Sequence, residues 1–295
     1  MTSFATATTV DEALAALAGG ARPVAGGTDL VVGARQGKAP LPDSLVAIHR
    51  LAELRGVDET AGGLRLGALA THAEVMAHPS VRVRFTALAD AAAIVGSHAT
   101  RAQGTVGGNL MNASPAMETG GPLVCLDASV TLRSPARTRT LPVAELLAGP
   151  GETTAQPDEL LVSVDVPAPP AGTGSAYVRL EYRRQMEIAV VGATAVVALE
   201  GDTVAAARIA ITALAPTIRR VPAAESALAG TSGGADAVEE AARGAAEAAS
   251  PISDVRASER YRTAMAEVIA RRAIEAALTR ARGGTVGIPA SGSAW

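Results

Sequence analysis

Two glycine-rich stretches hold the residues best suited to bind an anion. The first, VAGGTDLVVG (24–33), has the pair Gly26-Gly27 followed by Thr28 and Asp29. The second, GTVGGNLMNASP (104–115), has a second glycine pair among small polar side chains and contains no histidine, cysteine, lysine or arginine. Paired glycines can adopt φ > 0 and turn successive N–H groups toward one ligand, which forms an anion-binding nest. This composition favours ligand binding by backbone amides.

The two stretches are about 80 residues apart, and one ligand with a long phosphate bridge would account for both. A pyrophosphate can be held by uncharged amides through charge-assisted hydrogen bonds, each worth about 1.5–3 kcal/mol. The first stretch does not match GxGxxG or GxxxxGK[ST], so a Rossmann or P-loop site is not supported. The alternative for the first stretch is a tight turn with a helix cap.

The elements that must position these stretches follow from the hydrophobic pattern. A short helix over Thr9–Leu17, capped by Thr9 or Asp11, precedes the first stretch. Thr71 and Glu74 have the spacing of a capping box at the start of another helix. The pattern also predicts a helix over Phe85–Val95 and strands over Arg22–Val24, Leu45–His49, Leu64–Leu69, Ser129–Arg133 and Glu159–Val166.

A Pro/Gly-rich segment, VPAPPAGTG (166–174), predicts a domain boundary. Beyond it, the tripeptide EGD separates two strand-like runs and indicates a hairpin, which Ala-rich helical segments follow. The runs are Ala189–Leu199 and Val204–Leu214, the helices are 235–249 and 258–282, and 283–295 is expected to be a flexible tail. The whole pattern predicts an α+β fold in two parts.

Composition narrows the classes of function. With 295 residues, 48% of them hydrophobic, the chain can bury two cores. A net charge of −3 and the lack of a basic cluster argue against nucleic-acid binding.

The single cysteine, Cys125, excludes an intramolecular disulfide and a cysteine-ligated iron–sulfur cluster, and we expect it to be buried. The four histidines lack metal-type spacing and are expected at the surface or in caps. Without a signal peptide or an apolar run of membrane length, the chain is expected to be soluble and cytoplasmic.

Five segments in sequence order carry a family resemblance. They are AGGTDL, LRLGALATHAEV, RAQGTVGGNLMNASPAMET, YRRQMEIAVVGA and ERYRTAMAEVIARRAIEAA. Together they resemble the FAD-binding medium subunit of molybdenum hydroxylases, the family of xanthine dehydrogenase and aerobic carbon monoxide dehydrogenase flavoproteins. The resemblance implies a two-lobed FAD-binding domain of the vanillyl-alcohol-oxidase (PCMH) type over residues 1–170, with lobes of about 1–55 and 56–170. A smaller α+β domain over 175–282 follows.

The resemblance also implies which residues bind FAD. The first loop would meet the FAD diphosphate, and the second loop would complete the site. The residues implied are Ala25, Gly26, Gly27, Thr28, Asp29 and Leu30 in the first loop, and Thr105, Gly108, Asn109 and Ser114 in the second.

Three further positions are implied individually. Glu118, where the family usually has aspartate, would help to hold the sugar portion of the cofactor. Leu161 matches an aliphatic position near the flavin, and Arg179 lies where a lysine is common. No catalytic residue and no metal ligand is expected on this chain.

The same resemblance supplies partners. A small subunit with [2Fe–2S] clusters would pass electrons singly to FAD, and a large subunit with a molybdenum–pterin cofactor would oxidise the substrate. The three kinds of subunit would assemble as a dimer of heterotrimers. One alternative is a self-sufficient FAD-dependent oxidase or dehydrogenase of the same fold. Another is a structural module in which the glycine turns bind nothing.

Overall fold

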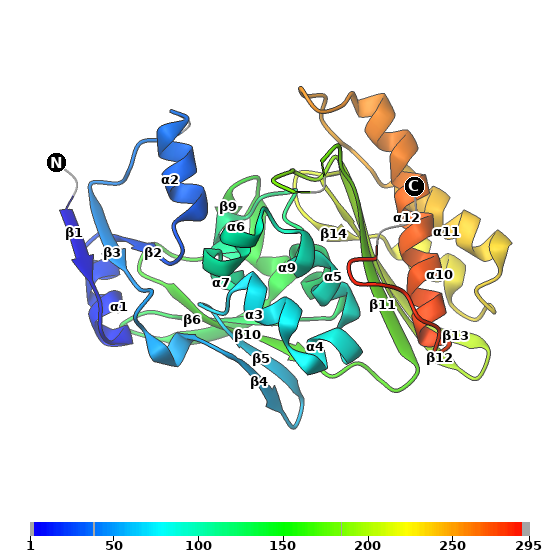
Figure 1. Ribbon diagram of the computed structural model, residues 1–295, viewed down its shortest axis with the longest axis horizontal. Helices are drawn as coiled ribbons and strands as arrows, with labels where there is room; N and C mark the ends of the chain where they lie inside the picture. The colour runs from blue at the N-terminus through cyan, green and yellow to red at the C-terminus, as the bar shows by residue number, and fades with distance from the viewer. Residues whose placement is uncertain (1–2, 38, 184, 291–295) are drawn as a thin grey trace.

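Three sheets follow one another along the longest axis of the molecule (Figure 1). The structure, a computed structural model, describes residues 3–37, 39–183 and 185–290. The mixed sheet and helix content confirms the α+β prediction. Within the described residues, no helix combines the length and the apolar character that a membrane crossing needs.

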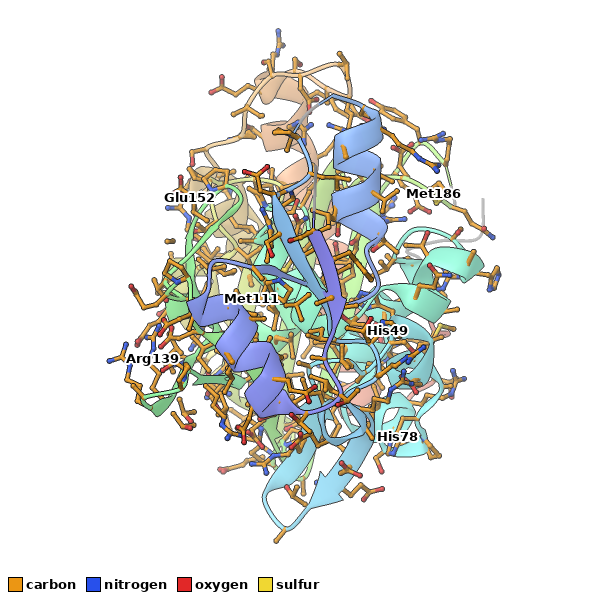
Figure 2. The ribbon with its side chains drawn as sticks, turned by 90° about the vertical axis from the view of Figure 1, so that its left-hand side faces the viewer. His49, His78, Met111, Arg139, Glu152 and Met186 are labelled. Carbon is orange, nitrogen blue, oxygen red and sulfur yellow. The ribbon has the colours of Figure 1, made fainter. Side chains whose placement is uncertain are left out.

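The N-terminal lobe is built on a parallel sheet with strand order β1-β3-β2. Its elements are β1 (Ser3–Thr6), α1 (Val10–Ala18), β2 (Arg22–Val24), α2 (Thr28–Arg35), β3 (Ser44–Ala47) and the 3-10 turn η1 (Ala52–Leu54). Thr9 caps α1 by accepting the N–H of Glu12, and α1 buries Leu14 and Leu17 in the core of the lobe. In contrast, α2 has no buried residue and extends away from the strands (Figures 1 and 2).

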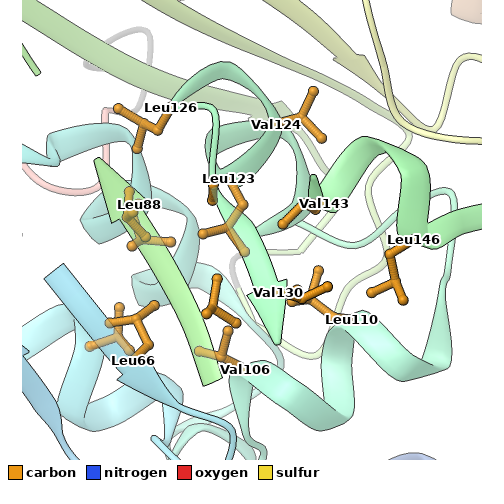
Figure 3. Packing of buried hydrophobic residues seen from close by; sticks show 14 of the residues in the cluster. Leu66, Leu88, Val106, Leu110, Leu123, Val124, Leu126, Val130, Val143 and Leu146 are labelled. Atoms are coloured by element: carbon orange, nitrogen blue, oxygen red, sulfur yellow. The ribbon is translucent and has the colours of Figure 1, made fainter. Parts of the chain in front are cut away.

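The middle lobe carries an antiparallel sheet of order β4-β5-β10-β6-β7, covered by short helices. Its strands are β4 (Val57–Thr60), β5 (Gly63–Gly67), β6 (Ser129–Arg133), β7 (Thr138–Pro142) and β10 (Leu160–Pro167), with the small pair β8 (Leu147–Gly149) and β9 (Glu152–Thr153) beside them. Its helices are α3 (His72–Ala77), α4 (Pro79–Arg84), α5 (Thr86–Ile94), α6 (His98–Gln103), α7 (Val106–Asn112), α8 (Gly120–Cys125) and α9 (Val143–Leu146). Figure 3 shows Val106 and Leu110 of α7 packed with Val130 of β6 in the core of this lobe.

The C-terminal part is an antiparallel sheet of order β11-β12-β13-β14 with helices packed on it. Its elements are β11 (Thr173–Leu180), β12 (Val191–Glu200), β13 (Thr203–Thr212), β14 (Arg219–Arg220), α10 (Pro222–Leu228), α11 (Ala235–Glu247) and α12 (Glu259–Ala281). The helix α12 approaches β11 closely, since a Cβ atom on Gly174 would lie 2.1 Å from the carbonyl oxygen of Ala277. Small residues on both elements therefore allow an Ala-rich core with few aromatic side chains.

Most of the elements expected from the sequence are present. The capping box of Thr71 and Glu74 forms, and the predicted hairpin pairs β12 with β13. Strand β10 ends at Pro167 and strand β11 begins at Thr173, so each strand overlaps one end of the predicted linker, 166–174. Of the expected tail, residues 283–290 are described, and Ala290 is buried. Residues 291–295 lie outside the described residues.

Candidate cofactor-binding site

The first glycine loop leads directly into the start of α2. Gly27 has φ 69 and occupies the N-cap position, and no side chain caps this helix. The first N–H groups of a helix have no partner within it, so those of Thr28, Asp29 and Leu30 are free of intrahelical bonds. These donors and the helix dipole together favour an anion at this end. Gly27 thus confirms the expectation of positive φ in this loop.

The second glycine pair is not a nest, and that expectation was wrong. Gly107 and Gly108 lie in the first turn of α7, with ordinary right-handed backbone, after the N-cap Thr105. The Oγ1 atom of Thr105 accepts the N–H of Gly108 at 3.0 Å. Glycine is needed at 107 for another reason, since a Cβ atom there would lie 2.6 Å from the carbonyl oxygen of Ala68. The pair allows close packing of a capped helix.

The two loops meet directly, as the shared-ligand hypothesis requires. A Cβ atom on Gly26 would lie 1.9 Å from the carbonyl oxygen of Gln103, so the two backbones are in contact. One residue later, a Cβ atom on Gly104 would lie 3.4 Å from the ring of His72 and 3.6 Å from Oγ1 of Thr28. We call this contact, formed by residues 26–28 and 103–105 with His72, the loop seam.

The other polar residues predicted in the second stretch, Asn109 and Ser114, come after the loop seam in the sequence. Asn109 is half-buried, and its Oδ1 accepts the hydroxyl of Thr119 at 2.6 Å, which leaves its amide NH₂ as a donor. Ser114 is also half-buried and accepts the N–H of Ala116 at 3.2 Å. Gly108 is exposed beside them. The exposed side of this loop therefore consists of backbone and amide groups.

Glu118 and Arg179 are joined to each other. The Nη1 atom of Arg179 lies 2.5 Å from Oε1 of Glu118, and its Nε donates to Glu181 at 2.7 Å. Only 1% of the Arg179 side chain and 9% of the Glu118 side chain are exposed. Burial raises the pKa of the Glu118 carboxyl, which the Arg179 guanidinium opposes. Sequence reasoning gave these two residues separate roles, and the structure makes them one buried ion pair.

Of the apolar members of the predicted set, Leu161 and Ala25 contact the cores, whereas Leu30 is half-buried on α2. Leu161 is buried in the middle-lobe core, on β10 beside a bulge between Leu161 and Ser163. The carbonyl of Val162 in this bulge accepts the N–H of Ala68, the residue against which α7 packs. Ala25 is partly buried against the core of the N-terminal lobe. Leu161 thus lies on the element that supports the second loop.

Two buried residues, one in the loop seam and one close to it in sequence, were missed by sequence reasoning. His72 was expected at the surface, but it is 2% exposed, and burial followed by the charge of Arg101 lowers its pKa to about 4. Arg101 is 5% exposed, and its Nη1 donates to the carbonyl of Val95 at 3.0 Å. The signal was present in the chain, because both residues lie within the segments that carry the family resemblance.

This arrangement fits a ligand with a diphosphate bridge. The uncapped start of α2 offers backbone donors, and the exposed Gly108 leaves space beside the amide of Asn109. The donors are almost all uncharged, as expected for a site in which close backbone approach replaces lysine. An FAD diphosphate matches this donor set.

Comparison with known families agrees with the architecture. The model described as "FAD binding domain in molybdopterin dehydrogenase" matches residues 1–169. The model described as "CO dehydrogenase flavoprotein C-terminal domain" matches residues 176–277.

Individual relatives point the same way. The carbon monoxide dehydrogenase medium chain of Hydrogenophaga pseudoflava is 33% identical over 239 residues, which cover 81% of this chain and 83% of that protein. The 6-hydroxypseudooxynicotine dehydrogenase complex subunit alpha of Paenarthrobacter nicotinovorans is 32% identical, with 95% of each chain covered.

A solved structure extends the likeness to three dimensions. Carbon monoxide dehydrogenase from Hydrogenophaga pseudoflava, in a form that lacks the Mo-pyranopterin moiety of the molybdenum cofactor, superimposes with a TM-score of 0.91 at 33% identity. The match covers 95% of this chain and 98% of that chain. Since a family model also spans more than half of the sequence, the chain belongs to the family of FAD-binding flavoproteins of molybdopterin dehydrogenases.

Proposed function

We propose that the loop seam binds the diphosphate of FAD, with the first turn of α2 as the main donor. The observation that carries this proposal is the contact between Gly26 and Gln103, because it brings two loops far apart in sequence to one place. At that place an uncapped helix start offers free N–H groups to an anion. The other residues of the first loop, Ala25 and Leu30, support its backbone.

The second loop and the buried ion pair complete the proposed site. Gly108 allows close approach, Asn109 donates from its amide, and Ser114 lies beside them on the same segment. Glu118, held by Arg179, orients toward the sugar portion of the cofactor. Leu161 supports the flavin side from β10. These residues bind and orient the cofactor, while the redox chemistry belongs to the flavin, which takes up electrons singly and passes them on as a pair.

The chain thereby serves as the FAD-carrying electron-transfer subunit of a molybdenum hydroxylase complex. We propose as partners a small subunit with [2Fe–2S] clusters and a large subunit with the molybdenum–pterin cofactor, assembled as a dimer of heterotrimers. The single, buried cysteine supports this division, because a cysteine-ligated cluster needs several thiolates. A cytoplasmic location stays a prediction from the sequence.

The relatives favour this function over a self-sufficient oxidase. The relatives are described as medium chains or as subunits. They include the putative xanthine dehydrogenase FAD-binding subunit XdhB of Escherichia coli, 28% identical with 95% of this chain covered. A protein that reduces its flavin with an added small substrate, without partner chains, would contradict the subunit role.

The binding site can be tested by titrating the flavin-free chain with FAD. We expect tight binding for the natural chain and at least a tenfold loss of affinity for Gly108→Val, since the new side chain occupies the exposed side of the second loop. The cost to folding should stay near the value of one helix cap, about 1 kcal/mol. Gly108 has right-handed helical backbone, and the only group its Cβ atom would displace is the hydroxyl of Thr105, at 2.9 Å.

Gly33→Val is the matched control. Gly33 lies on α2, and a Cβ atom at this position would meet no atom within 4 Å. We expect this variant to bind FAD like the natural chain. A Gly108→Val protein that carries a full complement of flavin would contradict the assignment of the second loop. A natural chain that takes up no FAD would contradict the proposed function itself.

A further inference from the structure

A helix of the FAD-binding part lies along the free edge of the C-terminal sheet. β11 is the edge strand, and α5 packs against it through polar groups. The hydrogen bonds along this edge are Ala87 N–H to Oγ of Ser175 (3.0 Å), Tyr177 N–H to Oδ2 of Asp90 (3.2 Å) and Nη1 of Arg179 to the carbonyl of Ile94 (3.2 Å). We call this row of contacts the α5–β11 seam.

The spacing of these contacts matches the two elements to each other. The helix partners lie at 87, 90 and 94, about one turn apart, and the strand partners lie at 175, 177 and 179, on one face of β11. The helical span from 87 to 94 rises about 10.5 Å, and the strand span from 175 to 179 rises about 13 Å. The two spans are similar in length, so the contacts follow one another along β11 from Ser175 to Arg179.

The middle of this seam is fixed by a buried ion pair. Arg280 of α12 donates to both carboxylate oxygens of Asp90, at 2.6 and 3.0 Å, with 0% of the Asp90 side chain and 8% of the Arg280 side chain exposed. Arg280 also donates to the carbonyl of Ser175 at 2.7 Å. One guanidinium thus binds α5 and β11 at once.

The chain beyond α12 closes over this pair. Arg280 donates to the carbonyls of Val286 at 3.2 Å and Gly287 at 2.8 Å, and the N–H of Ala290 donates to Asp90 at 2.9 Å. Ala290 is 3% exposed. Residues 286–290, here called the clasp, therefore complete the hydrogen bonding of a charge pair that would otherwise be incompletely satisfied.

The far end of the seam carries Arg179, which pairs with Glu118. We propose that Asp90 and Arg280, with the clasp, are positioning residues for the FAD site: they hold β11 on α5 so that Arg179 meets Glu118 where the sugar portion of the cofactor binds. This inference rests on the function proposed above. It assigns a role to three segments that contain no predicted site residue.

Asp90→Asn and a chain that ends at Gly284 provide two independent tests. The first removes the charge at the centre of the seam, and the second leaves both charges but removes the clasp. We expect each change to raise the Kd for FAD about tenfold and to alter the visible absorption spectrum of the bound flavin. The two changes combined should cost little more than either alone, because they act on one group of contacts.

A positioning role for Asp90 can be distinguished from a merely structural one. The test is to measure the effect of Asp90→Asn on the Kd for FAD both in the natural chain and in a Glu118→Gln chain. If Asp90 acts through Arg179 and Glu118, its effect on the Kd for FAD should fall to less than twofold in a Glu118→Gln chain. Independent destabilisation would instead give the same tenfold factor in both backgrounds, and that result would overturn the proposal.

Asp254→Asn is the matched control. Asp254 pairs at 2.8 Å with Arg262, which is a buried arginine on α12 like Arg280, and Arg262 donates to the carbonyl of Val190 instead of to a group of α5. It should lower the unfolding temperature and leave the Kd for FAD within twofold.

Equal FAD affinity in the natural chain, Asp90→Asn and the shortened chain would overturn this inference alone. Absence of FAD binding by the natural chain would overturn the proposed function. If Asp90→Asn does not fold, the shortened chain with and without Glu118→Gln supplies the same comparison.

Discussion

The two glycine loops lead into helices whose N-termini are capped differently. α2 begins at Gly27 in left-handed backbone, has no side-chain cap and buries none of its residues. α7 begins at Thr105, which satisfies the N–H of Gly108, and it buries Leu110 in the middle-lobe core. The N-terminus of α2 is therefore uncapped and lies at the surface, whereas that of α7 is capped and packed against the core.

This difference indicates a division of labour within one site. A helix start without a cap still has its N–H groups to offer, whereas a capped start has already used one of them. In the proposed site, the first loop would therefore supply donors, and the second would supply a rigid surface against which the first is placed. Both loops need glycine, but at Gly26 and Gly107 the need is for close backbone contact, and at Gly27 it is for positive φ.

The largest expected effect comes from separating the two loops. In Gly26→Ala the new methyl group would lie 1.9 Å from the carbonyl oxygen of Gln103, so one backbone must move. We expect a loss of about 3 kcal/mol in unfolding free energy and the loss of detectable FAD binding. Urea denaturation and flavin titration measure the two effects.

Gly33→Ala is the control for this change, because its methyl group would meet nothing within 4 Å and it lies inside the helix α2. Alanine is the better helix former, so this variant should be more stable by up to about 1 kcal/mol. A Gly26→Ala chain as stable as the natural one, with full FAD binding, would show that the loops do not depend on their contact.

An intermediate effect on the unfolding free energy is expected when His72 of the loop seam is protonated. His72 has its pKa lowered from 6.5 to about 4, so the fold favours the neutral imidazole. The unfolded chain binds the proton more readily, and the contribution of His72 is therefore complete above pH 6.5 and is lost as the pH falls toward 4. The shift corresponds to roughly 3 kcal/mol of unfolding free energy.

His72→Gln should remove this pH dependence. The backbone bond from residue 72 to the carbonyl of Gly104 does not need the ring and is retained. Unfolding free energies of the two chains, measured between pH 7 and pH 4.5, should converge as the pH falls. Glu159, whose pKa the hydrogen bond from Arg139 lowers to about 2, titrates below this window. Parallel curves for both chains would contradict the assignment to His72.

Local signals in the sequence predicted much of the fold. The capping residues Thr9 and Thr71 lie where their helices begin, because a cap depends on neighbours three residues away. The hairpin of β12 and β13 was also visible, because its turn and its two apolar runs are adjacent in sequence. The glycine pairs indicated the place of the proposed site for the same reason.

Contacts between distant segments could not be predicted in this way. The pairing of Glu118 with Arg179 and of Asp90 with Arg280 depends on how whole domains pack, and no spacing in the chain records it. The burial of His72 has the same origin, since the second loop covers it. The structure of Gly107-Gly108 was misjudged because a glycine pair permits a left-handed nest but does not require one.

The smallest effect should come from removing the side-chain cap of α7. Thr105→Ala removes the side chain that accepts the N–H of Gly108, and we expect a loss of about 1 kcal/mol in unfolding free energy, with a few-fold weaker binding of FAD. Thr105→Ser keeps the hydroxyl and should restore both values. If Thr105→Ala instead abolished FAD binding at unchanged stability, Thr105 would be a direct ligand contact, and the second loop would supply donors as the first one does. The ratio of the two losses therefore decides whether the loops differ in role or only in backbone form.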